Sequence, residues 1–318
     1  MNPTLPPYSV AIRTLGLAGE KFRRLLSSLH AQTHRPDKII IYLAQGYSIP
    51  PEATDREQIV FVPKGMVAQR ALPYDEIDTE WILFLDDDIE FRPDAVETMF
   101  NLLAKYGADV ICPDILPHTQ VSRSTKIKMA LLMSAIPRLS GKNKGYRVNI
   151  LGSYCYNPNP VIDAGWSTTN AGAVFLCRKR DFLSIHFEEE RWLDQSPYAI
   201  PDDMVMFYKM HLHGLKQLTW FHPGAEHLDA GSAMSNDRAR KIAFSHARNR
   251  YIFYRLYVYP HLSSFEKAAS IAGRFVATCI SWVYVRVKSC ITKSSVEVEA
   301  SRLGLQAGKE YIQSINKR

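Results

Sequence analysis

Cysteine is scarce in this sequence of 318 residues. Its five cysteines contain no CxxC pair and are odd in number: Cys112, Cys155, Cys177, Cys279 and Cys290. This spacing indicates neither a disulfide framework nor a zinc site. We therefore expect a protein of the reducing cytoplasm, either free in it or at the inner face of the cell membrane.

Hydrophobic segments long enough to cross a membrane are also missing. The N-terminal stretch MNPTLPPYSV has no charged region followed by an apolar core, so no signal peptide is predicted. Within residues 264–290 the longest uncharged run, Phe275–Val285, has 11 residues, whereas a span needs about 20. Basic residues flank this run and Trp282 and Tyr284 lie inside it, as in a helix at a membrane interface. A helix packed on its own domain, or in a dimer contact, is the alternative.

Glycine-rich nucleotide-binding motifs are absent as well. The sequence contains neither GxGxxG nor GxxxxGK(S/T), which leaves no dinucleotide or P-loop fingerprint. It has no aromatic-rich basic repeat and no recognisable nucleic-acid-binding module, so nucleic acid is not an expected partner.

Acidic residues are absent from a long central segment. The formal charge is +7, and residues 115–162 contain seven Lys or Arg but no Asp or Glu. We expect this basic insertion to face an anionic partner such as a nucleotide or a membrane surface. A solvated flap is the alternative. Within the insertion, Lys126–Ile136 has the spacing of a short helix.

What the chain does contain is an alternation of strands and helices. Apolar runs indicate strands near 8–13, 38–43, 58–62, 80–88, 108–112, 170–177 and 217–222. Amphipathic spacing predicts helices between them, including a short one around Gln69 and Arg70, and a basic helix over Arg238–Arg255. Such alternation predicts an α/β fold with a mostly parallel sheet, in one large domain or two modest ones.

The most informative stretch runs from Glu80 to Asp88, where an apolar strand ends in three carboxylates. Ligands of parallel sheets bind beyond the carboxyl ends of the strands, and adjacent carboxylates repel one another unless a positive charge lies among them. Mg²⁺ and Mn²⁺ suit such oxygens. Asp86 and Asp88 can point to one side while Asp87 points away. The alternative is a solvated loop that caps the next helix.

A second acidic site follows at Pro201-Asp202-Asp203, where the sequence predicts the start of a helix that ends at Gly214. A capping role would explain Asp202 but not Asp203. His227 lies just beyond the strand at 217–222, where it is either a metal ligand or a structural histidine.

Six segments, taken in order, resemble the motifs of family 2 glycosyltransferases with the GT-A fold. They are the first strand Ser9–Thr14, the helix and turn Leu26–Asp37, the Gly–Arg segment Lys64–Ala71, the DxD motif in Leu83–Asp88, the acidic helix Pro201–Gly214 and the basic helix His246–Arg255. The resemblance covers roughly residues 8–258. It implies a three-layer α/β/α sandwich over residues 1–260 and a C-terminal helical extension over 261–318.

Two departures from the family pattern narrow the expected activity. Where the family has an acidic DDGS that holds the base and ribose, this chain has Leu43-Ala44-Gln45-Gly46-Tyr47, and Gln45 can bond a base but carries no charge. Processive members have QxxRW after the acidic helix. Here Glu190-Arg191-Trp192 precedes that helix, as a packing element or an acceptor contact, so a non-processive enzyme is implied.

The resemblance also implies roles for individual residues. The donor would be a nucleotide-diphosphate sugar, and the acceptor a hydroxyl of a glycan or lipid-linked glycan in cell-surface polysaccharide assembly. Mg²⁺ or Mn²⁺ would be held by Asp86, Asp88 and His227, with His222 as the alternative ligand. Asp203 would be the general base of an inverting displacement, and Asp202 would orient the acceptor. Donor contacts would come from Arg13, Thr14, Gln45, Arg70, Asp86, Asp87, Asn170 and Gly172.

Two other functions remain open at this level. A sugar-nucleotidyltransferase also uses an α/β fold and metal-binding carboxylates, although Thr14–Lys21 matches its glycine-rich signature only weakly. A non-catalytic binder of anionic membrane surfaces would use the basic insertion instead.

Overall fold

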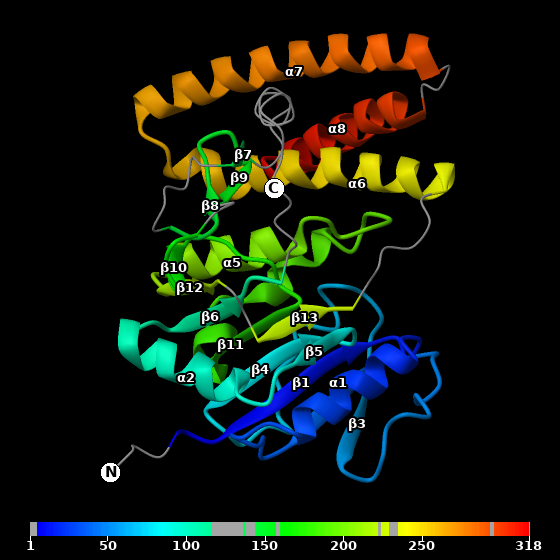
Figure 1. Ribbon diagram of the computed structural model, residues 1–318. Helices are drawn as coiled ribbons and strands as arrows, with labels where there is room; N and C mark the ends of the chain where they lie inside the picture. The colour runs from blue at the N-terminus through cyan, green and yellow to red at the C-terminus, as the bar shows by residue number, and fades with distance from the viewer. Residues whose placement is uncertain are drawn as a thin grey trace.

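The computed structural model describes residues 5–115, 136–137, 144–156, 160–221, 224–228, 235–292 and 296–317. In these ranges the centre of the molecule is a mixed sheet of strand order β10-β12-β6-β11-β4-β1-β2-β3, with helices on both faces and a helical region at one side (Figure 1). The helix predicted at Lys126–Ile136 lies, apart from Ile136, outside the described residues.

The central sheet is mostly parallel. Its strands are β1 (Tyr8–Thr14), β2 (Ile39–Ala44), β3 (Glu57–Val62), β4 (Trp81–Asp86), β6 (Val110–Pro113), β10 (Ala164–Ser167), β11 (Val174–Arg178) and β12 (Gln217–Trp220). Parallel pairs are β1 with β2, β1 with β4, β2 with β3, and β6 with β12. β11 runs antiparallel to both β4 and β6, and β10 antiparallel to β12. The predicted mixed α/β fold is therefore confirmed.

Alternating side chains of the strands build a separate core on each face of the sheet. Val10 and Ile12 of β1 pack with α1 (Glu20–His30) and α2 (Ala95–Tyr106), whereas Ala11 joins the opposite core with α5 (Asp202–Leu212). Both cores are closed because α1, α2 and α5 bury apolar stripes against strands that are apolar on both sides. The sheet is thus the middle of three layers.

Two smaller sheets flank the central one. β5 (Ile89–Phe91) pairs antiparallel with β13 (Ala225–His227) directly after the acidic end of β4. β7 (Ile136–Pro137), β9 (Tyr154–Tyr156) and β8 (Arg147–Val148) form the other small sheet, within the basic insertion. Short helical segments follow β11, namely α4 (Lys179–Leu183) and the 3-10 helix η1 (Phe187–Trp192).

The C-terminal third is helical. It contains α6 (Asn236–Phe253), the π-helical turn η2 (Tyr254–Val258), the 3-10 turn η3 (Tyr259–His261), α7 (Ser264–Thr292) and α8 (Val296–Ile315). α8 packs closely along α6 (Figure 1), because Gly304 and Gly308 put no side chain between the helices. A Cβ at Gly304 would lie 2.2 Å from the carbonyl oxygen of Phe244. α7 is the outermost helix, and none of the described helices is long and apolar enough to cross a membrane.

Three local expectations need correction or extension. Residues 65–71 form turns with helix-like hydrogen bonds, such as Gln69 N to Gly65 O at 2.9 Å, but no helix. The strand expected from residue 170 begins only at Val174. The helical extension expected over 261–318 includes α8, because the few apolar side chains after Lys293, among them Ile312, fall on one face and enter the core.

Candidate active site

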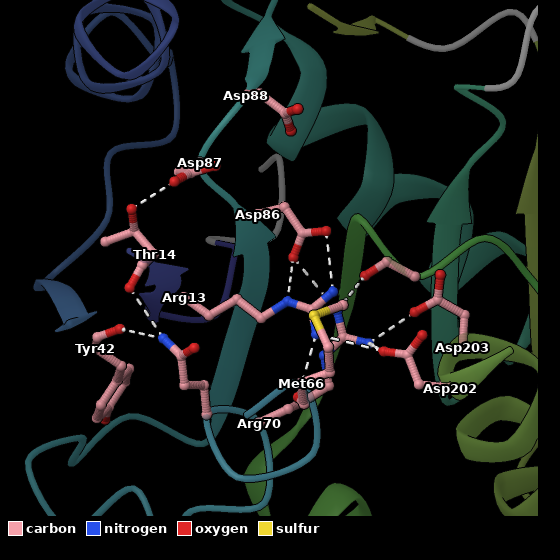
Figure 2. A network of polar contacts seen from close by, with 12 residues as sticks. Arg13, Thr14, Tyr42, Met66, Arg70, Asp86, Asp87, Asp88, Asp202 and Asp203 are labelled. Carbon is pink, nitrogen blue, oxygen red and sulfur yellow. Dashed lines mark hydrogen bonds and ion pairs between the residues drawn. The ribbon is translucent and has the colours of Figure 1, made fainter. Parts of the chain in front are cut away.

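The acidic stretch lies where β4 leaves the sheet. β4 stands between β1 and β11, so Asp86 emerges beside Arg13 at the end of β1. Asp86 and Asp88 extend to one side and Asp87 to the other (Figure 2), as the strand alternation predicts. Each of the three carboxylates has different partners.

Two arginines hold Asp86. Arg13 donates from Nε to Asp86 Oδ1 and from Nη2 to Asp86 Oδ2, the latter at 3.0 Å, in a bidentate pair. Arg70, from the turn at 65–71, places Nη2 3.4 Å from Asp86 Oδ1. The Arg70 side chain is only 3% exposed and lies over the ring of Phe175. The charge of Asp86 is thereby compensated by protein groups.

The same two arginines reach the acidic pair at the start of α5. Arg70 Nη1 lies 2.8 Å from Asp203 Oδ1, and Arg13 Nη1 lies 3.5 Å from Asp202 Oδ2. Figure 2 shows both guanidinium groups between Asp86 on one side and Asp202 and Asp203 on the other. Asp202 is not a helix cap, because the N-cap is Pro201 and no side chain caps it. The structure therefore joins two acidic sites that are more than a hundred residues apart.

Gly172 lets Asp203 approach Arg70. Its carbonyl oxygen accepts a hydrogen bond from Arg70 Nη2 at 2.8 Å. A Cβ at this position would lie 2.0 Å from Asp203 Oδ1 and 3.0 Å from Arg70 Nη1. Any larger residue at 172 would therefore push the carboxylate and the guanidinium apart.

Asp202 and Asp203 differ in exposure and in acidity. The side chain of Asp202 is 10% exposed and that of Asp203 34%. Burial and the neighbouring charge of Asp203 raise the pKa of Asp202 to about 6. Burial acts in the same direction on Asp203, but Arg70 and Arg13 outweigh it and hold the pKa of Asp203 below its usual range. Asp203 is thus the more accessible and the more firmly ionised of the two.

Asp88 faces a histidine that the backbone brings to it. β13 pairs with β5 so that His227 lies opposite Ile89, and the amide of Leu228 donates to the carbonyl of Asp88 at 2.8 Å. His227 Nε2 then lies 3.2 Å from Asp88 Oδ2. The alternative ligand His222 lies outside the described residues.

Asp88 and His227 are the residues that would hold a divalent cation. Both side chains are partly exposed, at 17% and 33%. No group of three metal-ligating side chains is found within the described ranges. A carboxylate and an imidazole nevertheless fit a cation that keeps several waters and binds substrate phosphates, which is the usual mode for Mg²⁺. Asp86 is committed to arginines and stands beside this pair.

Asp87 is tied to the end of β1. Thr14 Oγ1 donates to Asp87 Oδ2 and accepts from the amide of Gly16 at 2.7 Å. Burial raises the pKa of Asp87 to about 6, against the opposing effect of the Thr14 hydrogen bond. The two predicted donor-side residues Thr14 and Asp87 thus contact each other.

The remaining predicted residues lie in different settings. Gln45 is exposed in the turn after β2, where its backbone N–H donates to the Val62 carbonyl oxygen at 2.8 Å. The side chain of Asn170 is buried, and its Oδ1 accepts from Thr219 Oγ1 at 2.6 Å while its Nδ2 donates to Gln217. The amide of Asn170 therefore fastens the segment before Gly172 to β12.

Two supporting residues escape sequence reasoning. Gln69 is buried and donates from Nε2 to the carbonyl of Thr14 at 2.9 Å, which fixes the end of β1. Asp194 accepts from the amides of Val67 and Ala68, at 3.1 and 3.0 Å, and so holds the turn that carries Arg70. A lone Asp more than a hundred residues from its partners gives no periodic signal, whereas Gln69 lies inside a recognised motif.

Glu190 and Trp192 of the tripeptide Glu190-Arg191-Trp192 are packing residues. Glu190 is fully buried and accepts from Trp192 Nε1 at 2.6 Å and from Lys209 Nζ at 2.7 Å. It also accepts from the hydroxyl of Tyr257. These contacts join η1 to α5 and η2.

One comparison with known proteins bears on this site. Residues 62–159 match the family model described as glycosyl transferase family 2. The matched segment contains β4, Asp86–Asp88 and α2, and ends before α5, so Asp202 and Asp203 lie outside it. No curated protein matches the chain. The match supports a family 2 glycosyltransferase on this segment, and the mixed α/β fold agrees with the GT-A type.

Proposed function

We propose that this protein is a metal-dependent, inverting glycosyltransferase that moves one sugar from a nucleotide-diphosphate sugar to an acceptor hydroxyl. The observation that carries the proposal is the convergence of Asp86, inside the family-matched segment, and Asp203, outside it, on the guanidinium of Arg70. A transferase needs a donor site and a proton acceptor next to each other, and this arrangement supplies candidates for both.

The chemistry at the acceptor side would belong to Asp203. Free hydroxyl groups attack weakly unless a positioned base takes their proton. Asp203 is ionised, more exposed than Asp202, and fixed by Arg70 and Gly172. As the acceptor oxygen bonds to the anomeric carbon, its proton would pass to the Asp203 carboxylate, and the bond from that carbon to the diphosphate would break. A single displacement of this kind inverts the anomeric configuration.

The donor side would bind the diphosphate. Arg13 and Arg70 provide positive charge at the strand ends, and Thr14 and Asp87 are hydrogen-bonded to each other at the end of β1. A divalent cation at Asp88 and His227 would supply neutralisation of the negative charge on the leaving diphosphate. Arg13 and Arg70 would orient the donor beside Asp203, since they already span the distance between the two acidic sites.

A hexose is the transferred group that we propose, and a glycan or a lipid-linked glycan of a cell-surface polysaccharide is the acceptor. The acid-free insertion at 115–162 supports an anionic or lipid-linked substrate, because its seven basic residues have no internal acids to neutralise them.

A thermal-shift screen tests the donor site. Nucleoside diphosphates and sugar nucleotides are added one at a time with Mg²⁺ or Mn²⁺, and a ligand of the folded state raises the melting temperature. We expect at least one sugar nucleotide to do so only with metal present. If none does so with either metal, the donor assignment is wrong.

The products distinguish the rival enzyme. A transferase releases a nucleoside diphosphate from the sugar nucleotide that the screen identifies, in amounts that rise with acceptor. Release of pyrophosphate from a nucleoside triphosphate and a sugar phosphate would instead identify a sugar-nucleotidyltransferase.

A further inference from the structure

The outer face of α7 is an apolar stripe. Ile271, Phe275, Val276, Trp282, Val283 and Val287 are all more than half exposed. Their spacings of four, seven and eleven residues place them on one side of the helix. α7 has 29 residues, so the helix is roughly 43 Å long.

The opposite side of α7 is the one that packs on the protein. Ser270 bonds the Tyr254 hydroxyl at 2.6 Å and donates to the carbonyl of Ile150 at 2.8 Å. Arg274 donates to the carbonyl of Leu151 at 2.6 Å, and Ala277 is buried. These contacts fix the rotation of the helix, and Figure 1 shows α7 at the margin of the molecule. The stripe is therefore held outward by the fold.

The charges of α7 indicate what covers the stripe. The helix sequence has four basic residues, Lys267, Arg274, Arg286 and Lys288, and a single acid, Glu266. Arg274 and Lys267 contact the protein, at the Leu151 carbonyl and the Tyr259 ring. Arg286 stacks on Trp282 with its Cζ 4.2 Å from the ring, inside the stripe. Glu266 lies at the other end and accepts from the amide and hydroxyl of Ser263. A stripe of apolar side chains, a tryptophan and an arginine fits the boundary between acyl chains and anionic headgroups.

We propose that α7 lies in the plane of a membrane that carries anionic phospholipids, with the 271–287 stripe in the acyl boundary and Arg286 on a headgroup phosphate. A second copy of α7 is a poorer occupant. Its face would bury Arg286 against apolar side chains, and its one carboxylate is engaged at the helix start. The proposal stands on α7 alone and does not depend on the glycosyltransferase chemistry.

Vesicle flotation of the full-length protein tests this. The vesicles contain phosphatidylcholine alone, or a two-to-one mixture of phosphatidylcholine and phosphatidylglycerol. We expect the protein to float with the mixed vesicles, less with the neutral ones, and less at high salt. The double variant Phe275→Asp with Trp282→Asp should lower the vesicle-bound to free ratio by about tenfold or more.

Two further variants complete the test. Arg286→Glu should weaken binding to the mixed vesicles and leave binding to the neutral ones unchanged. Phe61→Asp on β3, which replaces another half-exposed aromatic residue, should float like the wild type. Circular dichroism and gel filtration verify that each variant is folded.

Three results would overturn the proposal. One is a wild-type protein that floats with neither kind of vesicle. Another is a folded double variant that floats as well as the wild type. The third is a dimeric mass by light scattering that the double variant loses while vesicles have no effect, which would assign the stripe to a second copy.

Discussion

The acidic stretch at the end of β4 and the acidic pair at the start of α5 meet at the same two arginines, but their carboxylates are held differently. Asp86, Asp87 and Asp88 each have a separate partner set, namely Arg13 with Arg70, Thr14, and His227. Asp202 and Asp203 share the two arginines, and the environment moves their pKa values in opposite directions. The first arrangement presents several anchors, whereas the second produces one accessible ionised group.

This difference suggests that the two acidic sites have different roles in binding and catalysis. Separate, partly exposed carboxylates suit the binding of a cation and a diphosphate. Two adjacent carboxylates with separated pKa values are the pattern of groups with distinct roles in proton transfer.

The largest effect is expected from Asp203→Asn. The amide keeps the size of the side chain and can still bond Arg70, but it cannot accept a proton from the acceptor hydroxyl. We expect kcat for transfer to fall by about 10²–10⁴-fold, as measured by nucleoside diphosphate release. Asp237→Asn on α6, where an exposed carboxylate pairs with Lys241, is the control and should keep the wild-type rate. Wild-type turnover in Asp203→Asn would remove this residue from the role.

Removal of metal tests only the proposed donor site at the end of β4. A nucleoside diphosphate at a hundred times its Kd stabilises the fold by about 2.7 kcal/mol, which for 318 residues is roughly 4 °C in melting temperature. We expect EDTA to abolish this shift and Mn²⁺ or Mg²⁺ to restore it. EDTA without nucleotide should leave the melting temperature unchanged. An equal shift in EDTA would show that the diphosphate binds without metal.

Arg70→Ala removes the link between the two sites. Asp203 and Gly172 O lose a buried donor, so we expect the free energy of unfolding in urea to fall by about 1–3 kcal/mol and nucleotide binding to weaken. Arg178→Ala is a matched control, since Arg178 pairs with Glu80, Asp109 and Asp181 away from the site. It should lose stability but keep nucleotide affinity. If both variants keep that affinity, Arg70 does not contact the donor.

The smallest effect concerns the pH dependence of stability. Asp202 has a pKa of about 6 in the fold, against about 3.9 in the unfolded chain, so the fold binds its proton more tightly. Its contribution to stability therefore falls as pH rises from about 4 to about 6. Asp203, with a lowered pKa, contributes stability above pH about 4 and loses it as pH falls through its folded pKa.

Urea unfolding at pH 4 and pH 7 separates the two carboxylates. Relative to the wild type, the free energy of unfolding of Asp202→Asn should gain about 1–3 kcal/mol between pH 4 and pH 7. The variant lacks the buried carboxyl group whose ionisation opposes folding. Asp203→Asn should show a smaller gain, because it removes the neighbouring charge that helps raise the pKa of Asp202 but leaves Asp202 buried. Parallel behaviour of the two variants would mean that their environments do not differ as described.

Much of the fold was predictable because it depends on local patterns. Apolar runs and helical spacing placed β1 to β4, β6 and α5 within one or two residues of their bounds. The sequence predicts a helical extension over 261–318 but not how α8 packs, because that packing depends on Gly304 and Gly308 meeting α6. The sequence predicts a short helix around Gln69 and Arg70, whereas the structure has turns there, because Asp194 from a distant segment accepts from the amides of Val67 and Ala68.

The residues of the candidate site can be named from the sequence, but their geometry cannot. Motif order pointed to Asp86, Asp88, Asp202, Asp203 and His227. Spacing could not reveal that Arg13 and Arg70 bridge the two acidic sites, since that depends on β1 and β4 being neighbours. Nor could it reveal that the buried side-chain amide of Asn170 is hydrogen-bonded to Thr219 of β12. Contacts between segments decide such details.

The most direct test of the division between the two sites is a calorimetric titration of one nucleoside diphosphate, with Mn²⁺, into the wild type, Asp88→Ala and Asp203→Asn. We expect Asp203→Asn to bind like the wild type, and Asp88→Ala to lose at least about tenfold in affinity, or about 1.4 kcal/mol. Wild-type affinity in Asp88→Ala, or an equal loss in both variants, would contradict the assignment of the β4 carboxylates to the donor and of Asp203 to the acceptor.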